Sequence, residues 1–194
     1  MKLYFIKLIP GLSLFILAFG CNDSSTTSET TSTDTAKTEN VETVPPPTTD
    51  TNTGTSNEFV NKIGASNMME IEMAKLAQTN GASQEVKDFG KTLETEHTAV
   101  LSTLRGVAAA QNINMPQAMT TDQSMHVQDM AAKKGADFDK EFINMMVEGH
   151  EKSIASFKDA AAGNENNQVK DFAQKTLPAL QKHLDRAKAI KAKM

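Results

Sequence analysis

The sequence predicts an all-α protein: a four-helix bundle with a long helical crossover, preceded by a disordered Ser/Thr-rich tether. Three observations support this prediction. Apolar residues recur at helical spacing through most of the C-terminal region. An eight-residue segment of the second predicted helix recurs, with one insertion, in the last predicted helix. The segment before the helices is almost without apolar residues. The chain therefore divides into a signal peptide (1–20), a linker (21–57) and a bundle (58–194).

The N-terminal segment is typical of a bacterial lipoprotein signal peptide. Lys2 and Lys7 precede an apolar run that is shorter than the ~20 residues that a membrane-spanning helix needs. The stretch "LAFGC" resembles a lipobox, which directs lipidation of Cys21, although Ala18 stands where leucine is commonest. We expect an exported lipoprotein anchored to a membrane through Cys21, in the periplasm or at the outer membrane. Secretion without lipidation is the alternative.

The linker has the composition of a disordered tether. Of its 37 residues 18 are Ser or Thr, and Pro45, Pro46 and Pro47 are consecutive. Such a segment cannot bury enough apolar surface to offset its ordering entropy. Its flexible reach would be about 30 to 36 Å. The linker carries a net charge of −5 and the bundle only −1, so no basic surface for nucleic acid is predicted.

Helical spacing predicts four bundle helices and one short helix in the crossover. Asn80 and Gly81 should end the first helix, and Pro178 should kink the last one. "VKDFGKTL" (86–93) recurs as "VKDFAQKTL" (169–177), which indicates a duplicated helical hairpin. Two such hairpins joined by a long connection form a ferritin-like bundle. The expected helices cover about 57–79, 83–111, 123–133 and 137–162, and a last helix follows Gly163 and Asn164.

Each bundle helix carries one polar residue close to its apolar stripe. At 100° per residue, Glu70, His97, His150 and His183 all face the expected core. The first three lie within about 3 Å of the middle of the bundle, whereas His183 is displaced along its helix by about 6 Å before any correction for a proline kink. Three further acidic residues are peripheral to this set: Asp139 on an inward face, Glu96 at the margin and Glu94 farther round.

Buried imidazole and carboxylate groups need partners, and two arrangements would satisfy them. The four residues Glu70, His97, His150 and His183 could bind one zinc, iron or copper ion, because imidazole and carboxylate suit all three metals. They could instead form a closed hydrogen-bond network in a structural or interaction protein. A degenerate di-iron oxidase is a third hypothesis, but too few carboxylates face the core for a two-iron site.

Other motifs add little to these hypotheses. The sequence contains no Ser/His/Asp set, glycine-rich phosphate loop or CxxC motif, so we expect a protein that is not an enzyme. The methionines of the crossover could bind cuprous ion, but filling gaps in the core is their more ordinary role. His126, also in the crossover, is expected at the surface.

The predicted bundle contains four characteristic segments, "NMMEIEMAKLAQTN", "VKDFGKTLETEHTAVLSTL", "ADFDKEFINMMVEGHEKSI" and "VKDFAQKTLPALQKHLDRA". In their order and spacing they resemble a known bacterial family, the domain of unknown function 4142, whose members are exported and ferritin-like. The resemblance covers residues 58–190 and implies recurrent polar positions at Glu70, His97, Asp139, His150 and His183; it implies no settled activity. We therefore expect a lipid-anchored envelope protein that acts as a binding or stress-related module.

Overall fold

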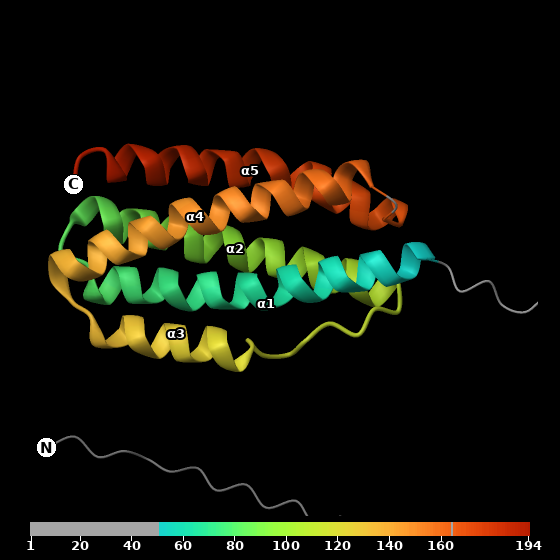
Figure 1. Ribbon diagram of the computed structural model, residues 1–194, viewed down its shortest axis with the longest axis horizontal. Coiled ribbons are helices and arrows are strands. Elements are labelled where there is room, and N and C mark those ends of the chain that lie inside the picture. The colour runs from blue at the N-terminus through green and yellow to red at the C-terminus, as the bar shows by residue number, and fades with distance from the viewer. Residues whose placement is uncertain (1–50, 164) are drawn as a thin grey trace, which may run out of the picture. The chain divides into compact units, whose positions relative to one another are not determined.

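The computed structural model describes residues 51–163 and 165–194, and this part of the chain is helical (Figure 1). The predicted signal peptide, Cys21 and most of the predicted tether lie outside the described residues. The described helices are α1 (Thr51–Asn80), α2 (Gln84–Ala110), α3 (Thr121–Ala132), α4 (Gly135–Ala162) and α5 (Asn167–Lys191).

The four long helices form two antiparallel hairpins that pack side by side. Helices α1 and α2 form the first hairpin, and α4 and α5 form the second. Helix α1 also contacts α4, and α2 contacts α5, while α3 packs on the outside of α1 (Figure 1). Because the crossover returns the chain along the bundle, α2 and α4 run in the same direction. The predicted ferritin-like topology with a helical crossover is confirmed.

Helix α1 begins earlier than the sequence predicted. It starts at Thr51, whereas the expected start was residue 57 and the expected domain boundary was 58. The Ser, Thr, Asn and Gly residues of its first turns have low helix propensity, which is why they were assigned to the tether. A tertiary contact stabilises them: Ser56 is fully buried, and its hydroxyl oxygen accepts a hydrogen bond of 3.0 Å from the backbone N–H of Asn166. The packed domain therefore includes the last residues of the predicted linker.

The turn between α1 and α2 is held by an acidic residue from the second hairpin. Asp139 of α4 is 3% exposed and accepts hydrogen bonds from the backbone N–H groups of Ala82 (3.0 Å) and Ser83 (2.8 Å). The hydroxyl of Ser83 makes no capping bond, although this residue precedes α2 as expected. An aspartate on α4 thus satisfies N–H groups that the start of α2 leaves free.

The core is apolar at both ends of the bundle and polar in the middle. Edge-to-face packing joins the rings of Phe59 and Phe157, 5.2 Å apart, and the rings of Phe138 and Phe142 stack at 5.7 Å. Between these clusters lie the side chains of Asn67, Glu70 and the three bundle histidines, all buried. Among the described helices, none is long and apolar enough to cross a membrane.

Candidate metal centre

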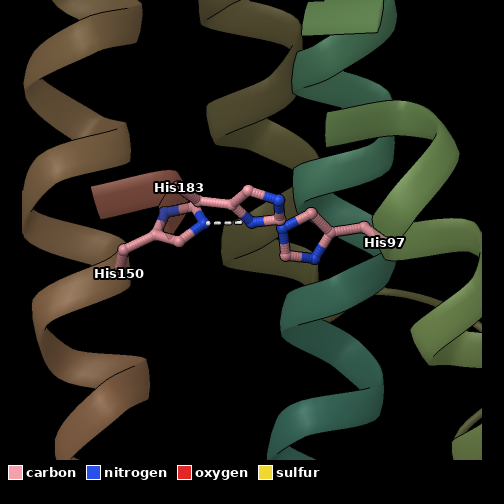
Figure 2. A group of neighbouring side chains, drawn as sticks. All are labelled: His97, His150 and His183. Atoms are coloured by element: carbon pink, nitrogen blue, oxygen red, sulfur yellow. Dashed lines mark hydrogen bonds between the residues drawn. The ribbon is translucent and has the colours of Figure 1, made fainter. Parts of the chain in front are cut away.

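Three histidines from three helices meet in the middle of the bundle. His97 comes from α2, His150 from α4 and His183 from α5, and none is more than 3% exposed. Each offers a ring nitrogen, and these nitrogens all lie within 4.8 Å of one another. Figure 2 shows the three rings facing one another, with the contact between His150 and His183 drawn as a dashed line.

The sequence predicted that His183 would be displaced along its helix by about one turn. In the structure its ring lies level with the rings of the other two histidines. Helical side chains lean toward the N-terminus of their own helix, so a ring at residue 183 reaches back toward the middle of α5. The estimate from Cα positions also treated the four helices as level and parallel, which helices in a bundle need not be.

A backbone carbonyl determines which ring nitrogen of His150 carries the proton. The Nδ1 atom of His150 donates to the carbonyl oxygen of Met146, one turn earlier in α4, over 2.8 Å. A carbonyl oxygen can only accept, so the proton of the neutral ring is on Nδ1. The Nε2 atom of His150, which points at His183, is then unprotonated.

The side-chain amide of Asn67 determines which ring nitrogen of His97 carries the proton. Asn67 donates from its side-chain nitrogen to the carbonyl oxygen of Ile63 (3.0 Å), which leaves its side-chain oxygen 2.9 Å from Nδ1 of His97. His97 therefore donates from Nδ1, and its Nε2 is unprotonated in the neutral ring. Burial lowers the pKa of His97, which favours that neutral ring even though the nearby Glu70 opposes the shift.

Glu70 lies beside the unprotonated nitrogen of His97. Its Oε2 atom is 3.0 Å from Nε2 of His97, but the geometry does not make a hydrogen bond. Both groups are buried, and the Glu70 side chain is only 7% exposed. A lone pair and a carboxylate oxygen at this distance repel each other unless a proton or a metal cation lies near both.

His183 donates away from the cluster. Its Nε2 atom donates to Oε2 of Glu96 over 2.7 Å. The pKa of His183 is lowered to about 4, mainly by burial and next by the neighbouring His97, so the ring is neutral at pH 7. Its Nδ1 atom is then unprotonated and lies 3.3 Å from the unprotonated Nε2 of His150.

Neutral rings thus direct three lone pairs toward one another. Two nitrogens that each bind the same zinc ion at about 2.0 to 2.1 Å, in tetrahedral geometry, are roughly 3.3 to 3.4 Å apart. The separation of 3.3 Å between Nε2 of His150 and Nδ1 of His183 has that value. A cation among the three nitrogens would turn mutual repulsion into coordination, and this is the chemistry that the arrangement allows.

The four acidic residues named from the sequence occupy different positions. Glu70 contacts His97 but is outside the group of three close ligand atoms. Glu96, 38% exposed, binds the outer nitrogen of His183. Glu94 accepts a hydrogen bond of 2.6 Å from the side chain of Gln78. Asp139 lies at the α1–α2 turn, so it takes no part in the cluster.

Sequence reasoning missed one residue of this site. Asn67 fixes the ring of His97, but helical spacing did not single it out. Its position offered a signal, because it precedes Glu70 by three residues and so lies on the same face of α1. His126, the remaining histidine, is exposed on α3 as expected.

Two crystal structures of DUF305 proteins have a similar fold. The protein from Streptomyces coelicolor is 12% identical, and the match covers 72% of this chain and 94% of that one with a TM-score of 0.61. A fragment from Deinococcus radiodurans is 9% identical, covering 77% and 100%, with a TM-score of 0.64. At these identities the likeness shows the fold alone. No curated protein matches the sequence.

The sequence also matches a family model over most of its length. The model is described as "Domain of unknown function (DUF4142)", and it matches residues 41–190. The match begins before the predicted boundary of the bundle, as the first turns of α1 do. The match includes all three clustered histidines, Glu70 and Asp139. This chain belongs to the DUF4142 family.

Proposed function

We propose that the bundle binds one transition-metal ion, zinc, iron or copper, through His97, His150 and His183, and that it acts as a binding module and not as an enzyme. The observation that carries this proposal is the direction of the ring protons. In each neutral ring the outer nitrogen donates to a fixed acceptor, which leaves the inner nitrogen free to coordinate. A metal needs the deprotonated nitrogen of a neutral imidazole.

The surroundings of the histidines match those of known metal ligands. A histidine that binds a metal almost always donates its other N–H group to a carboxylate, a carbonyl or water, which fixes the orientation of the ring. Here the acceptors are the Glu96 carboxylate, the Asn67 amide oxygen and the Met146 carbonyl oxygen. Glu70 is the candidate for a fourth ligand, because its carboxylate lies beside His97.

A hydrogen-bond network without metal satisfies these groups less well. For the contacts of these two rings with Met146, Glu96 and each other all to be hydrogen bonds, either His150 or His183 would have to carry two protons and a positive charge. A charge on a buried ring costs free energy, and the lowered pKa of His183, about 4, opposes it at that residue at neutral pH. The donor set does not fit a di-iron oxidase either, because the three close ligand atoms all belong to histidines.

Metal analysis of the full chain, purified without a histidine tag or chelator and then incubated with each of the three metals, tests the proposal. We expect about one equivalent of bound metal in the parent and none in a His97→Ala/His150→Ala variant. A His126→Ala variant is the control, because it removes an exposed histidine outside the cluster. Far-ultraviolet circular dichroism checks that each variant is folded. A parent that binds none of the metals would rule out the function.

We also infer that the protein is exported and anchored to a membrane through a lipid on Cys21. The support comes from the sequence, in which an apolar run and the "LAFGC" stretch precede a segment rich in Ser and Thr. A Cys21→Ser variant should leave the membrane fraction, whereas the parent should remain in it and show the mass of the attached lipid. Equal partition of the two proteins would contradict lipid anchoring.

A further inference from the structure

A pocket between α1 and α4 reaches Glu70, the carboxylate beside the candidate metal centre. It has a volume of about 280 Å³, and Glu70 of α1 and Gly149 of α4 are among the residues that line it. His126 of α3 also lines it. Because one water occupies ~30 Å³ in the liquid, the pocket has room for a hydrated ion. It therefore connects the surface of the bundle to the buried carboxylate beside His97.

Glu70 borders both the pocket and the histidines. Its Oε2 atom is 3.0 Å from Nε2 of His97, on the inner side. Its Oε1 atom is the nearest neighbour, at 3.8 Å, of the position that a Cβ atom on Gly149 would occupy. Since Gly149 has no side chain, nothing from that residue covers the outer side of the carboxylate. The Glu70 carboxylate thus lies between the pocket and the unprotonated Nε2 atom of His97.

The opposite side of the cluster is less suited to the passage of an ion. A second pocket, of about 370 Å³, is lined by Glu96 and Thr95 of α2. Glu96 there accepts the proton on the outer nitrogen of His183. An ion that arrived from this side would meet the Glu96 carboxylate, which already accepts the N–H group of His183, and then that N–H group and ring before any unprotonated ring nitrogen.

We propose that metal ions reach the three histidines through the α1–α4 pocket, and that the Glu70 carboxylate receives each ion and passes it inward. This inference rests on the proposed metal-binding function and adds the route by which the site is loaded. The charged side chains that line the pocket are two lysines, Lys62 and Lys152, and two glutamates, Glu70 and Glu148, so their charges balance. The buried carboxylate at its inner end is then the group that attracts a cation.

Filling the pocket should slow exchange without changing affinity. In a Gly149→Leu variant the Cβ atom makes only an ordinary contact, and the rest of the side chain occupies the pocket. A blocked route raises the barrier to loading and release equally, so the ratio of the two rates, and hence Kd, is preserved. We expect roughly tenfold slower release with an unchanged Kd. Gly149→Ala, which adds only the Cβ atom, should release metal at nearly the parental rate.

The experiment uses the full chain loaded with zinc, with release followed by a coloured chelator and Kd measured by competition. Gly106→Leu is the matched control, because Gly106 is an exposed glycine within α2 whose Cβ position has no neighbour within 4 Å. Thr95→Leu places the same side chain at the opposite pocket and should leave the rate unchanged.

The outcomes separate the route from the site itself. Slower release from Gly149→Leu alone, with one zinc still bound, supports the route. Equal rates in Gly149→Leu and Gly106→Leu, or slow release from Thr95→Leu instead, would overturn it and leave the metal site standing. Faster release with weaker binding in Gly149→Leu would also overturn it, because Gly149 would then support the site and not the route. A parent that binds none of zinc, iron and copper would remove the proposed function itself.

Discussion

In each of the three histidines, the neighbouring residues determine which ring nitrogen carries the proton and which faces the cluster. Asn67, for example, can present only its oxygen to His97, because its nitrogen is already used by the carbonyl of Ile63. Helical spacing identified the inward histidines but could not identify these acceptors. Which atom faces a ring depends on contacts between helices, and those contacts are set by packing that a single helix does not encode.

Replacing Asn67 by leucine tests this assignment. The variant removes the acceptor that holds His97, so we expect metal affinity to fall by about 10- to 100-fold while one ion still binds at high metal concentration. Asn61→Leu, an exposed asparagine on the same helix, is the control. Competition against a chelator of known affinity measures the difference. Equal affinities in the two variants would argue against the assigned role of Asn67.

The metal-free protein should lose stability as the pH falls. The pKa of His183 is lowered to about 4 in the folded chain, from an ordinary value of 6.5, mainly by burial. At pH values between these two pKa values, His183 binds a proton in the unfolded chain but not in the folded chain. The free energy of unfolding therefore decreases as the pH falls. We expect a loss of about 2 kcal/mol between pH 7 and pH 4.5, measured by urea unfolding. His183→Gln should show a shallower dependence.

At the scale of helices, periodicity predicted four bundle helices and a short helix in the crossover, and the observed bounds mostly agree within two residues. The largest error is the start of α1, where polar residues form a helix because Ser56 is held by the second hairpin. The repeated segment, 86–93 and 169–177, must also be aligned differently from the way its letters suggest. Val86 and Phe89 correspond to the buried Val169 and Phe172, but the buried partner of Leu93 is Thr176 and not the half-buried Leu177.

Asp139 should matter for the stability of the helices and not for metal binding. An Asp139→Ala variant leaves the N–H groups of Ala82 and Ser83 without their acceptor, at an expected cost of about 1 to 3 kcal/mol in the free energy of unfolding. Asp171→Ala, an exposed aspartate within α5, should change stability much less. Metal affinity should be unchanged in both. Weaker metal binding in Asp139→Ala alone would mean that this residue supports the centre.

At the scale of the whole molecule, a bound ion would stabilise the fold by mass action. At a free metal concentration of 100 times Kd, the expected gain in the free energy of unfolding is about 2.7 kcal/mol. Thermal unfolding with and without zinc should therefore show a higher Tm for the parent with zinc. The His97→Ala/His150→Ala variant should show no such shift. A similar shift in both proteins would mean that zinc binds elsewhere.

The three histidines do not all belong to one hairpin. His97 lies on the first, whereas His150 and His183 lie on the second, and the crossover is the only covalent connection between the two within the described residues. An ion held by all three would act as a second, reversible cross-link in parallel with the peptide chain. A protein cut once between α2 and α3 would then remain a single particle when loaded, and a chelator would loosen its two fragments. The bundle would respond to metal in the way that a two-chain protein responds to a disulfide.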